Sequence, residues 1–352
     1  MSEPNSPANF ASDNVAGALP EVITAVTEAA AVGAMPYGND LWTERVEQRL
    51  KDLFECDLWA FSVATGTAAN ALALSALCPP FGTVFCHPGS HANTDECGAP
   101  EFYTGGAKLT LVDGPDGKID PAALAAAIET ARPRGVHNMP PAAVTITQES
   151  EAGTVYSAGQ VEAIAEISGH HGLALHMDGA RFANALVALN CSPADATWRR
   201  GVDVLCFGAT KGGAMAAEAV IFFREAHAAA FGERRKRGGH LVSKMRFVSS
   251  QLVGYLTDDA WLRAARTANA GAAKLADGIS RIDGAELVRV PEANIVFAKL
   301  PLPTLDKLEA DGFGFYRVGS DGTIRLVVPW SVTDTDVDGL IDAVRSHIGV
   351  AA

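Results

Sequence analysis

Two polar residues follow apolar runs of the sequence at places where a catalytic site could form. Asp178 comes directly after the run 173–177, in the stretch Asp-Gly-Ala-Arg, and Lys211 follows the run 202–207, in the stretch Thr-Lys-Gly-Gly. A carboxylate at a strand end can hold a cationic ring nitrogen and so favour a protonated, electron-accepting ring. A desolvated lysine amine is the nucleophile that Schiff-base chemistry requires. Each motif also has a simpler interpretation, the aspartate as a helix N-cap or ion-pair partner and the lysine as a surface turn residue.

The stretch Thr65-Gly66-Thr67 lies between an apolar run and an alanine-rich stretch typical of a helix. Small residues and hydroxyls at a helix N-terminus offer free backbone N–H groups, side-chain donors and the positive end of the helix dipole, which together suit a phosphate. The stretch is not a Walker A loop, because no Gly-Lys-[Ser/Thr] ending is present. An ordinary threonine N-cap has the same appearance, so this motif alone is weak evidence.

His91 and Asp95 follow a further apolar run, 83–86. A histidine after a strand lies at the same sheet edge as the other motifs, where its ring can stack on a flat cofactor and act as a general base near neutral pH. A loop histidine on its own is usually a polar surface residue. The four motifs together are far more specific, because a phosphate cup, a stacking histidine, a ring-nitrogen aspartate and a Schiff-base lysine follow in this order, each after a predicted strand.

The elements that must position these residues alternate between short apolar runs and helical patterns. Nearly all-apolar strands separated by helices predict an α/β fold with a buried, mostly parallel sheet, at whose C-terminal edge ligands bind. The predicted strands are 58–63, 83–86, 108–112, 143–147, 173–177, 202–207 and 219–223, and the predicted helices include 69–77, 121–130 and 158–170.

The pattern changes at about Leu241 to longer helices, followed by strand-like stretches at 295–300 and 323–328. This change predicts a smaller C-terminal α+β domain. The dense charge run 233–237 is interpreted as the solvated end of a helix. The predicted parts are therefore a flexible N-terminus (1–9), a large domain (10–240) and a small domain (241–352).

The composition limits the class of protein. A formal net charge of -13 argues against nucleic acid or an anionic membrane as a partner, and 48% hydrophobic residues allow a sizeable core. The six cysteines form no CxxC pair and show no spacing to histidine that suggests zinc, so we predict reduced thiols and no metal site. The sequence has no secretory-signal pattern and no apolar run of about 20 residues, which predicts a cytoplasmic protein.

Taken in order, these motifs resemble those of the bacterial low-specificity L-threonine aldolases, which are pyridoxal-phosphate enzymes of the aspartate-aminotransferase-like fold (fold type I). The resemblance runs from about Phe10 to the C-terminus. It implies a homodimer or homotetramer with shared active sites. The stretches that carry it are Ser12-Asp13-Asn14, Tyr37-Gly38-Asn39-Asp40, Thr65-Gly66-Thr67-Ala68 with Asn70, His91, Asp178-Gly179-Ala180-Arg181 and Thr210-Lys211-Gly212.

The resemblance also implies a role for each matching residue, around a pyridoxal 5'-phosphate cofactor and a β-hydroxy-α-amino acid substrate. For the cofactor, it implies that Lys211 forms the Schiff base, Asp178 pairs with the ring nitrogen, His91 stacks on the ring, and the phosphate is bound by Thr65, Gly66 and Thr67. For the substrate, it implies that Ser12 and Arg325 bind the carboxylate, that Tyr37 contacts the substrate, and that Arg181 contacts both substrate and cofactor. Arg246 would reach the phosphate or the active site of a neighbouring subunit.

One departure from the family concerns the base that removes the β-hydroxyl proton. Many members carry a histidine in a Glu-Asn-Thr-His stretch, where this chain reads Gln-Glu-Ser-Glu and ends in Glu151. Asp95 likewise stands where others have an aromatic residue. The candidate bases are therefore His91, Asp95, Glu151 and an ordered water.

The expected reaction is aldol cleavage of L-threonine, L-allo-threonine or phenylserine-like substrates to glycine and an aldehyde. β-Elimination, transamination or racemisation would use the same lysine and aspartate, because fold and cofactor do not decide which bond breaks. A catalytically inactive binding protein and a nucleotide-binding module are the alternatives from other classes. The intact Asp178 and Lys211 argue against the first, and the lack of Walker A and GxGxxG motifs argues against the second.

Overall fold

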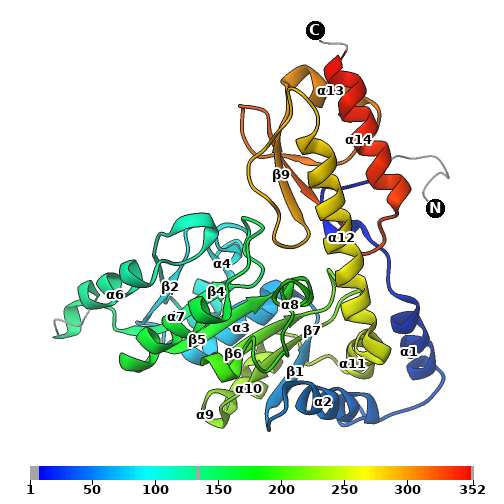
Figure 1. Cartoon of the computed structure of the whole chain (residues 1–352). Coiled ribbons are helices and arrows are strands. Elements are labelled where there is room, and N and C mark those ends of the chain that lie inside the picture. Colours follow the sequence, from blue (N-terminus) through cyan, green and yellow to red (C-terminus); the bar gives the residue numbers. More distant parts are fainter. Residues whose placement is uncertain (1–7, 132–134, 350–352) are drawn as a thin grey trace.

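A seven-stranded sheet forms the centre of the lower lobe of the computed structural model (Figure 1), which describes residues 8–131 and 135–349. The strand order is β1-β7-β6-β5-β4-β2-β3. All neighbouring strands from β6 to β3 are parallel, and only β7 runs antiparallel to its neighbours β6 and β1. The predicted mostly parallel α/β sheet is confirmed. The strands are β1 (Trp59–Val63), β2 (Thr83–Cys86), β3 (Lys108–Leu111), β4 (Pro141–Thr147), β5 (Ala174–Gly179), β6 (Val204–Gly208) and β7 (Glu218–Phe222).

The helices of this lobe begin at capping residues that the sequence supplies. The side chains of Asp40, Thr65, Asp120 and Ser157 each accept a hydrogen bond from a first-turn backbone N–H group, which satisfies a donor that the helix itself leaves free. The helices are α1 (Pro20–Ala30), α2 (Leu41–Phe54), α3 (Gly66–Leu77), α4 (His91–Thr94), α5 (Ala99–Thr104), α6 (Pro121–Thr130), α7 (Ala158–His170), α8 (Phe182–Leu189), α9 (Glu225–Ala228), α10 (Phe231–Arg237) and α11 (Arg246–Tyr255).

The upper lobe is a four-stranded antiparallel sheet in the order β10-β11-β9-β8, packed against three helices. Strands β8 and β10 have two residues each, which is too short to show a periodic pattern in the sequence. The elements are α12 (Ala260–Ser280), β8 (Glu286–Leu287), β9 (Ile295–Lys299), α13 (Leu302–Ala310), β10 (Tyr316–Arg317), β11 (Thr323–Val327) and α14 (Asp334–Gly349).

The long helix α12 joins the two lobes and contributes to both hydrophobic cores. Trp261 near its start packs in the core of the large lobe, whereas Leu275 packs in the core of the small lobe. Phe10 also belongs to the small-lobe core, where its N–H group donates to the Gly314 carbonyl (2.8 Å) and its carbonyl accepts from the Val327 N–H group (2.7 Å). The packing thus favours a boundary between the two lobes within α12. The domain boundary predicted between residues 240 and 241 remains a prediction. The predicted flexible segment 1–9 falls mostly on residues 1–7, outside the described part of the chain.

The charge run 233–237 forms most of α10, and the interpretation as a fully solvated helix end is wrong for one residue. Arg235 is 9% exposed, donates to the Ser62 carbonyl (3.3 Å) and lies over the Phe61 ring. Burial lowers the pKa of Arg235 to about 10. The side chain packs against β1 because its long aliphatic stem covers apolar surface while the charge keeps a carbonyl partner.

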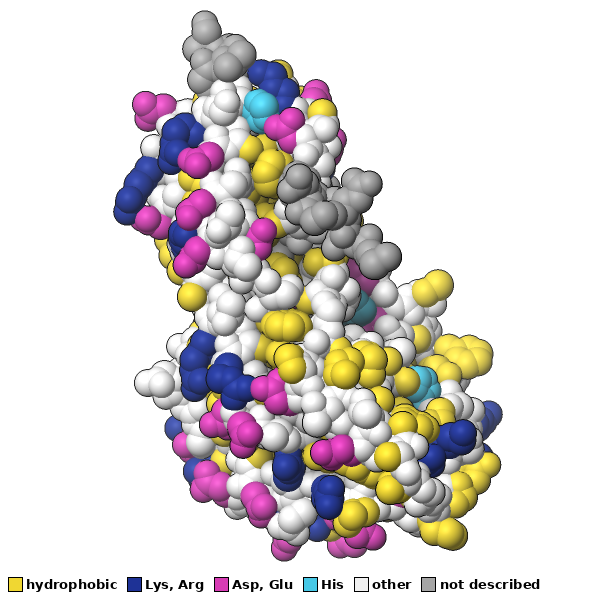
Figure 2. Space-filling view, turned by 90° about the vertical axis from the view of Figure 1, so that its right-hand side faces the viewer, with side chains coloured by type: hydrophobic (Ala, Val, Ile, Leu, Met, Phe, Trp, Pro, Cys, Tyr) yellow, Lys and Arg dark blue, Asp and Glu magenta, His cyan; other side chains and the backbone are white. Residues whose placement is uncertain are grey.

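On the face that Figure 2 shows, apolar side chains gather mainly on the lower lobe, and a recess lies between this lobe and the upper one. Among the described residues, no helix is long and apolar enough to cross a membrane.

Candidate active site

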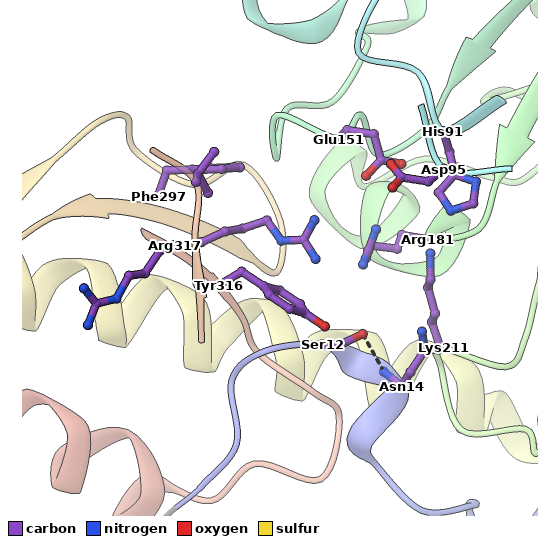
Figure 3. A pocket seen from close by; sticks show the side chains of 12 residues that line it. Ser12, Asn14, His91, Asp95, Glu151, Arg181, Lys211, Phe297, Tyr316 and Arg317 are labelled. Carbon is purple, nitrogen blue, oxygen red and sulfur yellow. Dashed lines mark hydrogen bonds between the residues drawn. The ribbon is translucent and has the colours of Figure 1, made fainter. Parts of the chain in front are cut away.

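The C-terminal ends of β4, β5 and β6 meet at one edge of the sheet, and two cavities adjoin there. One cavity of about 300 Å³ lies at the sheet edge, and one of about 640 Å³ extends toward the small lobe (Figure 3). Lys211 and His91 line both. The structure brings together eleven of the predicted site residues here: Ser12, Thr65, Gly66, Thr67, His91, Asp95, Glu151, Asp178, Arg181, Lys211 and Arg325.

Asp178 is fixed at the end of β5 by two hydrogen-bond donors. One carboxylate oxygen accepts from the Ala180 N–H group (2.9 Å) and the other from Asn70 Nδ2 (2.8 Å). The side chain is buried and lines the smaller cavity. A carboxylate has about four lone-pair sites, so two donors leave capacity for a further donor in the cavity.

The layer beneath Asp178 is polar but uncharged near neutral pH. His176, two residues earlier on β5, is fully buried between the Thr145 hydroxyl (2.8 Å) and the Cys206 thiol (3.1 Å). Burial lowers the pKa of His176 to about 4 and raises that of Cys206 well above its usual value. Neither side chain therefore supplies a charge that could neutralise Asp178.

Lys211 lies in a tight turn after β6 that needs both of its glycines. A Cβ atom on Gly212 would collide with the ring of Tyr255, and Gly213 has a positive φ of +119°. Glu218 on β7 supports the turn, because its carboxylate accepts from the Ala209 N–H group at 2.7 Å. Burial raises the pKa of Glu218 to about 7. The turn thus presents the lysine to both cavities from a rigid base.

The N-terminus of α3 faces the smaller cavity with the residues predicted to bind a phosphate. The hydroxyl of Thr65 caps the helix by accepting from the Ala68 N–H group (3.2 Å). A Cβ atom built on Gly66 meets nothing within 4 Å, so the space beside this backbone is open to a ligand. The first-turn N–H groups of a helix have no backbone partner within it, and Gly66 and Thr67 of this turn line the smaller cavity.

Arg181 reaches the larger cavity as part of a buried ion pair. Its Nε donates to one carboxylate oxygen of Asp13 (2.6 Å) and a terminal nitrogen donates to the other (3.1 Å). Burial alone would raise the pKa of Asp13, but the charges of Arg181 and Lys211 and the hydrogen bonds from Arg181 and Asn294 together outweigh burial, and the pKa is lowered. Asn294 of the small lobe adds a weak hydrogen bond to Asp13 (3.4 Å). This contact fixes the segment that carries Ser12 beside Arg181.

The small lobe also lines the larger cavity with arginine, and Arg325 is the one without a carboxylate partner among the described residues. Arg325 on β11 lies over the Tyr316 ring, 5.4 Å from its centre, and its buried Nε makes no hydrogen bond to another described residue. Guanidinium groups suit carboxylates because they offer several donors in a fixed plane. Arg181 and Arg325 therefore present two cationic donors to one cavity from different lobes.

The remaining predicted residues divide into two groups. Asp95 and Glu151 line the larger cavity, and Figure 3 shows their carboxylates beside His91. Tyr37 and Arg246 line neither cavity: a lysine amine lies over the Tyr37 ring, and Arg246 donates to the Ala29 carbonyl (3.2 Å). Their predicted roles are not provided within one chain and stay predictions. In the described part of the chain, no cluster of three or more His, Cys, Asp or Glu residues could hold a metal ion.

Sequence reasoning gave no role to several buried polar residues of this region. Asn70 follows the phosphate motif by one helical turn, and its place in the α3 pattern could have indicated that it faces the same cavity. Glu218 is the acidic start of an otherwise apolar strand, which is itself a signal for a specific role. Asn294 carries no local signal, because its partners are distant in the sequence.

Glu149 is a further missed residue: it is buried, and neither carboxylate oxygen makes a hydrogen bond of good geometry to another described residue, although the Asn294 backbone lies near enough to lower its pKa slightly. Burial raises its pKa to about 8, although the nearby Arg181 opposes this change. Asp13 and Glu151 raise the pKa further. Glu149 is therefore mainly protonated at neutral pH and places a neutral acid beside the Asp13–Arg181 ion pair.

Glu149 is expected to make the folded protein less stable as the pH rises from about 5 to about 8. The unfolded chain loses this proton near the ordinary value of 4.5, whereas the folded chain keeps it up to about 8, so the free energy of unfolding falls between these values. At about 1.4 kcal/mol per pKa unit, the loss is on the order of 4 kcal/mol.

Urea denaturation of Glu149→Gln at both pH values measures this effect, because the variant has no such proton to lose. From the lower to the higher pH, the free energy of unfolding of the variant should rise relative to that of the wild type. The exposed Glu162→Gln is the matched control and should follow the wild type. An equal difference between Glu149→Gln and the wild type at both pH values would show that Glu149 is ionised throughout.

Comparison with known proteins agrees with this geometry. The model of the beta-eliminating lyase family matches residues 9–301. Low-specificity L-threonine aldolases of Pseudomonas aeruginosa and of a Pseudomonas sp. are 44% and 43% identical, covering 96% of this chain in each case and 96% and 97% of their own lengths. A solved structure of the Leishmania major threonine aldolase superposes with a TM-score of 0.91 at 27% identity, covering 97% of this chain and 99% of that one. The chain thus has the predicted fold type I architecture and belongs to the beta-eliminating lyase family, within the branch of the low-specificity L-threonine aldolases.

Proposed function

We propose that this protein is a pyridoxal-phosphate-dependent aldolase that cleaves L-threonine, L-allo-threonine and related β-hydroxy-α-amino acids such as phenylserine to glycine and an aldehyde. The observation that carries the proposal is the arrangement of Lys211, Asp178 and the α3 N-terminus around one cavity, next to a second cavity that Arg181 and Arg325 line from different lobes. The similarity to low-specificity L-threonine aldolases over nearly the whole chain supports the same reaction.

The residues of the smaller cavity fit pyridoxal phosphate. The buried carboxylate of Asp178 suits the ring nitrogen, Lys211 supplies the amine, and the open backbone at Gly66 suits the phosphate. When bound, this cofactor accepts the electron pair of the bond that breaks at the substrate Cα atom. Thr65 and Thr67 add hydroxyl donors at the phosphate, and the His91 ring lines the same cavity in reach of stacking.

The residues of the larger cavity fit an amino-acid carboxylate. Ser12, Arg181 and Arg325 approach it from the N-terminal segment, the large lobe and the small lobe, respectively. Holding the carboxylate from three sides orients the substrate, so that the Cα–Cβ bond is the one that breaks. Selection of this bond separates aldol cleavage from transamination, which breaks a bond to hydrogen.

A base beside the Cβ atom must take the hydroxyl proton as the Cα–Cβ bond breaks and the aldehyde leaves. His91, Asp95 and Glu151 line the larger cavity together, and all three border the space that the β-hydroxyl would enter. A group that holds this proton at one atom and returns it to the glycine product would complete the proton balance. His91 is the best placed of the three, because it lines both cavities.

The purified protein is expected to release glycine and acetaldehyde in equal amounts from L-threonine and to show a visible absorbance band from bound cofactor. Lys211→Ala should lose both the band and the activity. Asp178→Asn should bind the cofactor but lower kcat on the order of 10²–10³-fold, because the charge that holds the ring nitrogen is lost. Lys299→Ala, an exposed lysine of the small lobe, is the matched control. Release of ammonia and a keto acid in place of glycine and aldehyde would identify an eliminating enzyme.

We further propose a homodimer or homotetramer whose subunits share active sites. Tyr37 and Arg246 have no role in the cavities of their own chain, and Tyr37 lies in a segment with the exposed apolar residues Met35 and Leu41. Apolar surface of this kind is typical of a protein interface. A neighbouring subunit would bring these two side chains to the site.

Mixed oligomers test this arrangement. Arg246→Ala and Lys211→Ala are each expected to be nearly inactive, but chains refolded together should regain about a quarter of the wild-type activity, because half of the dimers are hybrids with one intact site. A mixture as inactive as its two components would place Arg246 at the site of its own chain or outside any site.

A further inference from the structure

Four polar side chains at the sheet edge form one continuous hydrogen-bonded chain that links Asp178 to His91. Asn70 Nδ2 donates to Asp178 at 2.8 Å and to Glu96 Oε1 at 2.8 Å. The same Glu96 oxygen lies 2.9 Å from His91 Nδ1. The Glu96 side chain is fully buried, whereas His91 is 30% exposed toward the cavities.

The chemistry of these groups fixes the direction of each hydrogen bond. An amide nitrogen carries two hydrogens and can serve two acceptors, whereas the amide oxygen would be repelled by two carboxylates. Asn70 therefore turns its nitrogen toward Asp178 and Glu96. Because an ionised carboxylate only accepts, the proton between Glu96 and His91 belongs to His91 Nδ1, and Nε2 is left with a free lone pair.

We propose that Glu96 is a positioning residue for the proposed reaction: it holds the His91 proton on Nδ1, so that Nε2 accepts and returns the substrate proton. This inference rests on the proposed function. It gives His91 the role of base for a structural reason that Asp95 and Glu151 lack, since only His91 is backed by a buried carboxylate. Asn70 contributes by holding that carboxylate at a fixed position relative to Asp178.

The charges around His91 act in the same direction as the hydrogen bond. The bond to Glu96 is the main cause that raises the pKa of His91, and burial opposes it. Asp178 and Glu151 raise this pKa further, and Asp95 and Lys211 line the cavity around the ring. Burial raises the pKa of Glu96 itself, while the bonds from His91 and Asn70 lower it. Loss of the Glu96 charge is thus expected to make His91 a weaker base.

Substitution of Glu96 by glutamine separates charge from shape. Glu96→Gln keeps an oxygen that can accept from His91 and Asn70 but removes the negative charge, so the pKa of His91 should fall by ~1 unit or more. NMR titration of the ring nitrogens in the cofactor-loaded protein measures this pKa, with the His91 signals assigned by their loss in His91→Asn. The acidic limb of the kcat/KM profile for L-threonine should move to lower pH by the same amount.

Two further variants complete the test. Asp113→Asn removes an exposed acid that pairs with a different histidine, His87, and should leave the titration of His91 unchanged. Glu96→Asp keeps the charge but draws it back by one methylene, so it should give an intermediate pKa for His91 and also provides a readout if the glutamine variant does not fold. A His91 titration equal to that of the wild type in folded Glu96→Gln or Glu96→Asp overturns the role of Glu96. No threonine cleavage by the wild type overturns the proposed function instead, whatever the titration shows.

Discussion

The buried ion pair between Asp13 and Arg181 is the contact on which both halves of the site depend. It joins the N-terminal segment, which packs into the small lobe through Phe10, to the end of β5 in the large lobe. Removing one partner of such a pair leaves an uncompensated buried charge and typically costs about 3–5 kcal/mol. The pair therefore holds the two lobes together at the cavities, and its guanidinium also lines the larger cavity.

Several of the buried polar groups around the site are neutral. His176, Cys206 and Glu149 are buried and stay uncharged near neutral pH, because burial disfavours their charged forms. Asp178 and Asp13, by contrast, accept hydrogen bonds from Asn70 and Arg181, respectively, which favour their charged forms. Asp178 thus places negative charge in the smaller cavity, and Arg181 and Arg325 place positive charge in the larger one. A site of this kind can favour the transition state without reorganising at the moment of reaction.

Much of this arrangement could be predicted from the sequence, because the C-terminal ends of parallel strands share one edge of a sheet. Asp178, Lys211 and His91 each follow an apolar run, so their convergence required only the fold class. Asn70 and Glu218 carry local signals, but the hydrogen bonds of Asn70, Glu96 and Glu218 could not be predicted, since they join elements that have no fixed spacing in the sequence.

The packing of α12 and of Arg235 likewise could not be predicted from the sequence. The long pattern of α12 indicated a helix but not that it packs in two cores, because its apolar face is continuous. Arg235 lies in a charged run, and only the packing against β1 buries it.

The proposed attachment of pyridoxal phosphate to Lys211 can be measured directly. Borohydride reduction of protein reconstituted with pyridoxal phosphate would fix the cofactor to the lysine that holds it, and mass spectrometry of the digested protein would identify that residue. We predict one phosphopyridoxyl group per chain, on the peptide that contains Lys211. A label on another lysine, or no label on protein reconstituted with pyridoxal phosphate, would contradict the assignment of the site.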